Sequence, residues 1–310
     1  MSADDVLCIG CKFDYLKTIG KFYGDNEASV EFLRSHGVLP LGVKCKKCHR
    51  PCSFRSDTRS WRCRRQFLDH LDGRKKCCNY EVSDCAGTLL EKSKIQPWKC
   101  LLFVNHWLSR NWDHECINEC LQFSRSTSVF WRSYCSDVLE DWFHRQNPIG
   151  GVGVVVEIGM TSIQQTWLLG GIERASKKSF VVSLRNQEVN EDLLVPLIKK
   201  HVLPGSVICT EYIMEYASLS SHEYVLATTN ASSIDSKCCT LTVESMWCDV
   251  KKSLMRSGMR EKYLEQYLAK YLFVCHHENS KQVLHHFFTE VGQIYPPKAN
   301  HANVNMSISY

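Results

Sequence analysis

The chain has 310 residues, of which 44% are hydrophobic and 23% are charged, an ordinary composition for one large or two average globular domains. Its net charge of +5 at pH 7 permits a nucleic-acid partner but does not demand one. No signal peptide is recognisable, and no segment reaches the roughly 18 uncharged apolar residues of a membrane span. We therefore expect no membrane contact, and we expect the 18 cysteines to be free or bound to metal in a reducing compartment.

The first 92 residues divide into two parts of different character. Residues 1–42 form an N-terminal lead-in, in which 27–37 has the pattern of a short amphipathic helix closed by Gly37. Residues 43–92 are rich in cysteine and arginine, dense in turn formers and poor in apolar periodicity. Such a segment cannot bury much of a core, so something else must hold it together.

Four cysteines of this module are candidate zinc ligands: Cys45, Cys48, Cys63 and Cys78. The first two form a Cys-x-x-Cys pair, and four thiolates suit a tetrahedral structural zinc whose binding stabilises a small fold. The second pair has an irregular spacing, so Cys77 is an alternative to Cys78, and there are three competing ligands: His49, Cys52 and Cys85. The pattern predicts a zinc ribbon, and the alternative is a set of buried cysteines without metal.

Many basic residues surround these cysteines. They form either a surface that contacts DNA phosphates or an ordinary solvated face, and the first interpretation follows from the release of counterions when fixed cations neutralise DNA. The candidate DNA-binding residues are Lys44, Lys46, Lys47, Arg62, Arg64, Arg65, Arg74, Lys75 and Lys76.

Residues 93–147 are predicted to be helical. Pro97 suits the first turn of a helix, and two further helices are expected over 113–122 and 126–142, with Ser126 or Thr127 as the N-cap of the second. Two helices joined by so short a turn match the spacing of a helix-turn-helix, although a plain helical hairpin would have the same pattern.

A break in the pattern at residues 146–151 marks the start of a region rich in predicted strands, 148–275. Strands are expected over 151–159, 166–174, 179–185, 206–211 and 223–229, and helices over 190–202, 241–258 and 260–274. Residues 276–310 are expected to hold a C-terminal helix and a disordered tail from Tyr295. The histidine pairs at 276–277 and 285–286 lack the regular spacing of a helical metal site, so we interpret them as surface or packing residues.

Several segments together resemble the insertion-sequence-type transposases and their eukaryotic relatives, the Merlin elements. After the cysteine module, the matching segments are 87–107, the helix pair, 156–163, 170–185, 194–216 and 242–254. The resemblance implies an α+β or α/β fold, in which a zinc ribbon and a helix-turn-helix-like region precede an RNase H-like mixed sheet. It also implies DNA cutting by two divalent metals held on an Asp-Asp-Glu triad, because clustered carboxylates are the hard ligands that Mg²⁺ prefers.

The triad is altered in this sequence. The first Asp of the family pattern is replaced by Gly159, the second position holds Glu211, and the third matches Glu244. Glu157 faces the same way as Gly159 on a strand, but the family already carries Glu there, so Glu157 is no fresh replacement. The two remaining triad residues also have plainer interpretations, since Glu211 would suit the surface end of a strand and Glu244 the first turn of a helix.

The sequence therefore favours a transposase-derived protein that binds double-stranded DNA through a structural zinc module and has a degenerate catalytic site. Mg²⁺ is expected only if catalysis is retained. The expected partners are duplex DNA and, as a possibility, a second copy of the chain, with no small-molecule substrate; a nuclear location follows from the DNA binding. The alternatives are an active transposase or nuclease with an altered carboxylate set, and a protein-interaction module without DNA binding.

Overall fold

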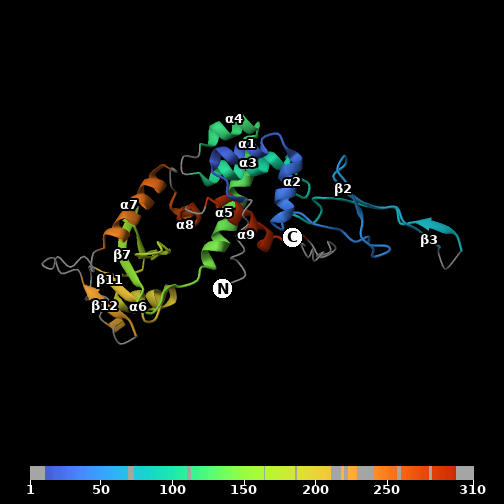
Figure 1. Ribbon diagram of the computed structural model, residues 1–310. Coiled ribbons are helices and arrows are strands. Elements are labelled where there is room, and N and C mark those ends of the chain that lie inside the picture. Colours follow the sequence, from blue (N-terminus) through green and yellow to red (C-terminus); the bar gives the residue numbers. More distant parts are fainter. Residues whose placement is uncertain are drawn as a thin grey trace. The chain divides into compact units, whose positions relative to one another are not determined.

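A computed structural model describes residues 11–68, 73–109, 113–163, 165–185, 187–210, 218–219, 223–228, 240–256, 260–278 and 281–297 (Figure 1). The chain divides into two compact units, one formed by residues 1–131 and 280–310 and the other by residues 132–279. Among the described residues, no helix is both long and apolar enough to cross a membrane. The last thirteen residues, which belong to the predicted disordered tail, lie outside the described residues.

The first unit contains five helices that pack around aromatic and leucine side chains, and it also shares the start of α5. The five are α1 (Tyr15–Phe22), α2 (Asn26–Ser35), α3 (Pro97–Leu108), α4 (His114–Leu121) and α9 (Val283–Ile294). Aspartates cap three of these helices, because a carboxylate satisfies backbone N–H groups that the first turn leaves open; they are Asp14, Asp25 and Asp113. Phe22, Leu33, Phe103 and Phe287 are fully buried. The predicted helix over 27–37 corresponds to α2, whereas α1 was not anticipated.

The helix pair has the short turn that the sequence predicted, but its cap is different. Helix α5 (Arg125–His144) begins after Ser124, whose hydroxyl accepts a hydrogen bond from the backbone N–H of Thr127 at 3.2 Å. Neither Ser126 nor Thr127 is the N-cap, because the helix starts before both. The left-handed backbone of Gln122, with φ 56°, ends α4 and lets the chain reverse into α5.

The cysteine-rich module contains two small antiparallel sheets. One has the order β1 (Ser53–Arg55), β2 (Ser60–Cys63), β5 (Tyr80–Ser83), and the other pairs β3 (Gln66–Leu68) with β4 (Lys75–Cys77). The buried carboxylate of Asp84 joins the module to α2, since it accepts hydrogen bonds from Arg34 at 3.0 Å and from the indole of Trp61 at 3.0 Å.

The second unit is built on a five-stranded mixed sheet in the order β12–β11–β7–β8–β9. Its strands are β7 (Val155–Ile163), β8 (Thr166–Glu173), β9 (Ser179–Ser183), β11 (Val207–Thr210) and β12 (Val225–Thr228). The first three form an antiparallel meander, and β11 and β12 are parallel to β7. The first strand starts later than the predicted residue 151, because Gly151 and Gly153 have φ angles of 130° and 75°, outside the extended range. A short parallel pair, β6 (Ile149–Gly150) and β10 (Val202–Leu203), lies beside this sheet.

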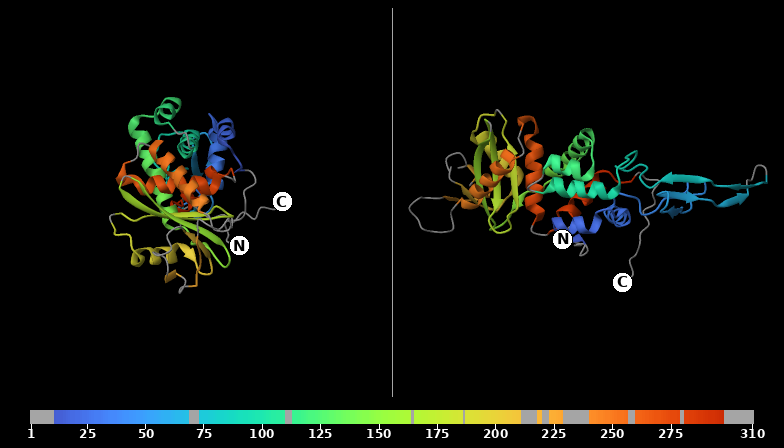
Figure 2. Two further views of the ribbon diagram at one scale, coloured as in Figure 1. Left: turned by 90° about the vertical axis from the view of Figure 1, so that its left-hand side faces the viewer. Right: turned by 90° about the horizontal axis from the view of Figure 1, so that it is seen from above.

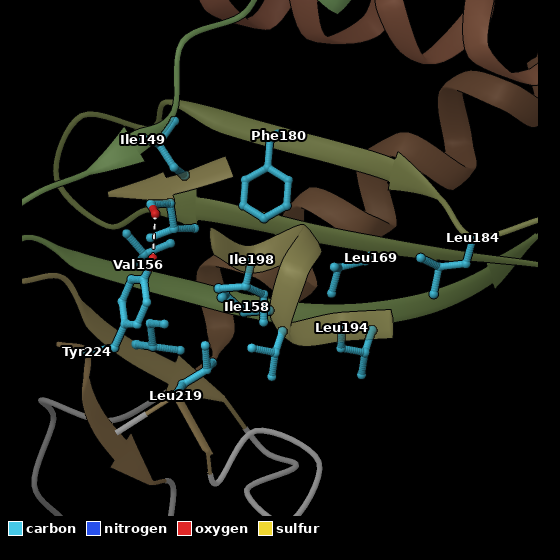
Figure 3. Close-up of a cluster of buried hydrophobic side chains, with 13 residues drawn as sticks. Ile149, Val156, Ile158, Leu169, Phe180, Leu184, Leu194, Ile198, Leu219 and Tyr224 are labelled. Carbon is cyan, nitrogen blue, oxygen red and sulfur yellow. Dashed lines mark hydrogen bonds between the residues drawn. The ribbon is translucent and has the colours of Figure 1, made fainter. Parts of the chain in front are cut away.

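Helices cover both faces of the sheet (Figure 2). On one face, α6 (Glu191–His201) places Leu194 and Ile198 against Val156 and Ile158 of β7 and Leu169 of β8, which forms the main core of this unit (Figure 3). On the other face, α7 (Leu241–Arg256) packs against β7 and β8, and α8 (Leu264–Glu278) packs against β9. The predicted helix over 260–274 is thus a short 3-10 turn, Glu261–Tyr263, followed by α8.

Candidate functional site

The triad positions fall on β7 and α7. Gly159 lies in β7 on the face that α7 covers, and Glu244 lies in the first turn of α7. Glu211 follows β11 in the sequence, but it lies outside the described residues. The geometry of the site is therefore that of β7, its neighbour β8 and the N-terminal half of α7.

Glu157 is fully buried beneath the start of α7. One carboxylate oxygen accepts hydrogen bonds from the backbone N–H groups of Thr242 and Val243, at 2.8 and 3.0 Å. The other accepts a hydrogen bond from the Arg174 guanidinium at 2.7 Å, which is also an ion pair. A carboxylate at a helix N-terminus satisfies open N–H groups and faces the positive end of the helix dipole. Glu157 therefore anchors α7 to β7, and both of its oxygens already have donors.

The space in front of Gly159 is filled by α7. Gly159 pairs across the sheet with Gly170 of β8, and the Trp247 indole lies over both glycines. A Cβ atom at position 159 would lie 3.2 Å from a Val243 methyl and 3.3 Å from Trp247 Nε1. At position 170 a Cβ would lie 2.6 Å from the indole ring, which is closer than real atoms approach. The Trp247 indole therefore packs directly against the two paired glycines.

Trp247 Nε1 is buried and has no hydrogen-bond acceptor among the residues that the structure describes. A buried N–H without an acceptor costs about 1–3 kcal/mol. The nitrogen lies close to the place where a side chain of residue 159 would begin. An aspartate at this position would therefore bring an acceptor to the indole, but in a space that is already tight.

Glu244 has a different environment, because its side chain is exposed. One of its oxygens accepts a hydrogen bond from the Thr240 hydroxyl at 2.9 Å, one turn earlier. Among the described residues, Glu157 and Glu244 do not join a third ligand in a metal-sized group. Glu157 therefore has a structural role, and Glu244 is an exposed residue in the first turn of a helix.

The structure brings the four predicted zinc ligands together. The Sγ atoms of Cys45, Cys48, Cys63 and Cys78 all lie within 4.8 Å of one another. Cys48 Sγ and Cys63 Sγ are 3.7 Å apart, which matches the edge of about 3.8 Å that a tetrahedron with Zn–S bonds of about 2.3 Å requires. The choice between the two adjacent cysteines falls on Cys78, which is buried, because Cys77 is exposed on β4. The residues present therefore fit a zinc ion with four thiolate ligands.

The irregular spacing of the second pair has a structural cause. In the first pair, Cys45 and Cys48 belong to one tight turn, which ends at His49 with φ 57°. In the second, the backbone N–H of Cys78 donates to the carbonyl of Arg65 at 2.9 Å, and the β3–β4 hairpin lies between them. Asn79, directly after Cys78, has φ 45° and repeats the left-handed turn end of the first pair. The second turn is thus like the first, extended by an inserted hairpin.

The competing ligands lie elsewhere in the module. Cys52 packs against the four thiols without joining them, and the Cys85 sulfur accepts a hydrogen bond from Arg59 at 3.3 Å. Burial raises the pKa of the Cys63 thiol to about 11, whereas the backbone hydrogen bond from Arg50 lowers the pKa of Cys48 to about 7. Four such sulfurs become thiolates together only if a cation compensates their charge. The structure records no disulfide among the cysteines it describes.

The basic candidates differ in their surroundings. Arg62 is half-buried and pairs with Glu81 at 2.7 Å, so it takes part in the packing of the module, whereas Arg64 lies 3.5 Å from the same carboxylate and is exposed. The remaining candidates are exposed: Lys44, Lys46, Lys47, Arg65, Arg74, Lys75 and Lys76. Lys75 and Lys76 lie on β4, which is exposed along its whole length, as is β3.

The strand order defines the class of the second unit. In RNase H-like domains, three antiparallel strands form a meander, two further strands lie parallel to the first of them, and helices cover both faces of the sheet. The second unit has this arrangement. Residues 146–274 match the family model of the ISXO2-like transposase domain, and this similarity supports a relationship of the second unit to DDE transposases.

The catalytic core domain of BIV integrase is similar at 12% identity, covering 39% of this chain and 82% of that one, with a TM-score of 0.30. The RNase H-like arrangement of the second unit is given by its own strand order. No curated protein sequence matches this chain.

Proposed function

We propose that this is a transposase-derived protein that binds duplex DNA and no longer catalyses strand breakage or joining. The observation that carries the proposal is the site of the first carboxylate, where Gly159 supplies no ligand and Val243 and Trp247 fill the adjacent space. Two metals about 3.5–4 Å apart need carboxylate oxygens between them. Glu157 does not supply these oxygens, since they hold Arg174 and the start of α7.

The protein binds one structural zinc through four cysteines, Cys45, Cys48, Cys63 and Cys78. The mutual distances of their sulfur atoms support this assignment. This ion holds together a module whose strands bury few side chains. Mg²⁺ belongs to the function only if catalysis is retained.

The β3–β4 hairpin is the candidate DNA-binding element of the cysteine-rich module. It is exposed on both faces, and a two-stranded ribbon has dimensions that fit the major groove. Phe67 pairs with Lys76 and Leu68 with Lys75, so on each face of the hairpin an apolar side chain of β3 lies opposite a lysine of β4. An isolated two-stranded hairpin is only marginally stable, which favours a binding role over a structural one. The exposed lysines beside Cys45 extend the same positive charge.

The remaining features of the proposal follow from the transposase relationship. We infer a domesticated, Merlin-like origin, a nuclear location and contact of the α4–α5 pair with DNA as a helix-turn-helix. Homodimerisation belongs to the same proposal.

Binding to a fluorescent DNA duplex, followed by anisotropy over a salt series, tests the DNA interface. We expect affinity to fall steeply between about 50 and 200 mM salt, because bound cations release counterions. The double variant K46Q/K47Q should bind more weakly and lower the salt slope by about 2, or about 1 per lost phosphate contact. The matched control is K199Q/K200Q, which removes two exposed lysines from α6.

Two results would contradict this interface. A salt-independent affinity would argue against phosphate contacts, and no duplex binding by a folded protein would favour the protein-interaction alternative. If both double variants lose equal affinity, net charge and not the cysteine-rich module is responsible.

A strand-nicking and strand-transfer assay with Mg²⁺ and Mn²⁺ tests the absence of catalysis. We expect the unaltered protein and the Gly159→Asp variant to leave DNA intact, since Trp247 and Val243 occupy the space that a metal-bound carboxylate needs. Divalent-ion-dependent cleavage by the unaltered protein would establish the active-enzyme alternative. A Glu244→Gln variant then distinguishes cleavage by this site from a contaminating nuclease.

A further inference from the structure

A second group of metal-ligating side chains is separate from the four-cysteine cluster. Cys11 precedes α1, His36 is the C-cap of α2, and His285 lies in the first turn of α9. Their ligand atoms lie within 4.8 Å of one another, and all three residues belong to the first unit. The zinc prediction does not involve them, and His285 was expected from the sequence to be a surface or packing residue.

The distances around His36 Nε2 approach those of a metal site. This nitrogen lies 3.6 Å from Cys11 Sγ, and a tetrahedral zinc with one sulfur and one nitrogen ligand separates the two by about 3.6 Å. His285 Nδ1 lies 2.8 Å from the same nitrogen. Two nitrogen ligands of zinc lie about 3.3 Å apart, so binding requires the imidazoles to separate by about 0.5 Å.

His36 is already oriented as a ligand. Its Nδ1–H donates to the Phe32 carbonyl at 2.6 Å, which leaves Nε2 with the lone pair that faces Cys11 and His285. Ligand histidines commonly donate their other N–H to a backbone carbonyl in this way. The ring is also stacked on Phe32, with centroids 3.9 Å apart.

The backbone around the cluster is closely packed. A Cβ on Gly292 of α9 would overlap the His36 carbonyl oxygen and touch Gly37, so α9 approaches the end of α2 through a glycine. This approach fixes His285 next to His36, although 249 residues separate them. A cation here would link both ends of the described chain.

We propose that Cys11, His36 and His285 bind a second zinc-like transition-metal ion. One thiolate sulfur and two imidazole nitrogens are ligands that zinc prefers in proteins. The three ligands come from the segment before α1, the end of α2 and the first turn of α9, so the ion would hold these segments together.

Zinc content of the purified full-length protein, measured by mass spectrometry of the metal, tests the proposal. We expect two zinc ions per chain, and one in each of the variants H285A and C11S. The double variant C45S/C78S should retain one, held by the new site. His286→Ala is the matched control, because this neighbouring histidine of α9 is not in the cluster and its loss should leave two ions.

Cobalt replacement supplies a readout that does not depend on variant stability. The unaltered protein loaded with Co²⁺ should show two classes of tetrahedral absorption, one from four thiolates and one with histidine ligands. One metal per chain in the unaltered protein, or two in folded H285A, would overturn the proposal. In that case His36 and His285 form a hydrogen-bonded pair that simply holds α2 against α9. The DNA-binding proposal does not depend on this result, since its zinc site is tested separately by C45S/C78S.

Discussion

The four-cysteine cluster and the triad region differ in how well their residues are placed to hold a metal. In the cluster all four thiols converge at distances suited to a metal, although an inserted hairpin separates two of them in sequence. In the triad region the strand that should carry the first carboxylate carries Gly159, and a tryptophan rests above it. The scaffold around both regions is intact, since the sheet order and the small β1–β2–β5 sheet are complete.

The two regions differ in what stabilises them. A small module with few buried side chains depends on a bound metal, so its ligands and its fold are coupled. The sheet of the second unit is instead stabilised by packing, since Val243 and Trp247 of α7 lie directly over Gly159. Glu157 contributes to this packing because it holds α7 through two backbone N–H groups and Arg174.

The largest expected effect is the loss of metal from the cysteine cluster. Structural zinc contributes about 10–16 kcal/mol in small zinc-finger units, so C45S/C78S should unfold the module around β1, β2 and β5. Hydrogen exchange measured by mass spectrometry should rise over residues 43–85 and remain unchanged in β7 and β8. Cys77→Ser, at an exposed neighbouring thiol, should behave like the unaltered protein. Unchanged protection in C45S/C78S would mean that packing alone holds the module.

Glu157 should have the next largest effect. Breaking a buried ion pair by removing one partner costs about 3–5 kcal/mol, so Glu157→Ala should lower the free energy of unfolding by that amount. Urea denaturation measures the change, and Glu157→Gln, which keeps an oxygen for the α7 N–H groups, should lose less. Glu244→Ala serves as control and should cost under about 1 kcal/mol, since this side chain is exposed. Equal losses at the two positions would refute the anchoring role of Glu157.

The smallest expected changes in stability concern alanine substitutions at the two paired glycines. Gly170→Ala should destabilise the domain by about 1–3 kcal/mol, because its methyl group would overlap the rigid Trp247 ring. Gly159→Ala should cost less, because its contacts of 3.2–3.5 Å need only a shift of a few tenths of an ångström. Thermal unfolding of both variants measures the order. The reverse order would show that α7 does not rest on Gly170 as described.

Much of the second unit was accessible from the sequence. Its strands were recognised because apolar runs and turn residues alternate over short distances, and the predicted helix over 190–202 corresponds to α6. The start of β7 was wrong because the glycines at 151 and 153 adopt positive φ angles that no apolar pattern reveals. The cap of α5 was wrong by two or three residues, since three neighbouring hydroxyl residues are equally suitable by type.

The sequence by itself determined which kinds of ligand were available: a group of cysteines in one module, and a glycine where a carboxylate was expected. Those facts concern residue type, and type alone decides whether an oxygen or sulfur ligand exists. Only the tertiary structure decided that Glu157 caps α7, that Trp247 covers Gly159, and that His36 meets His285. These contacts join residues 85, 88 and 249 positions apart, where local pattern carries no information because chain closure over such distances is decided by the packing of whole elements.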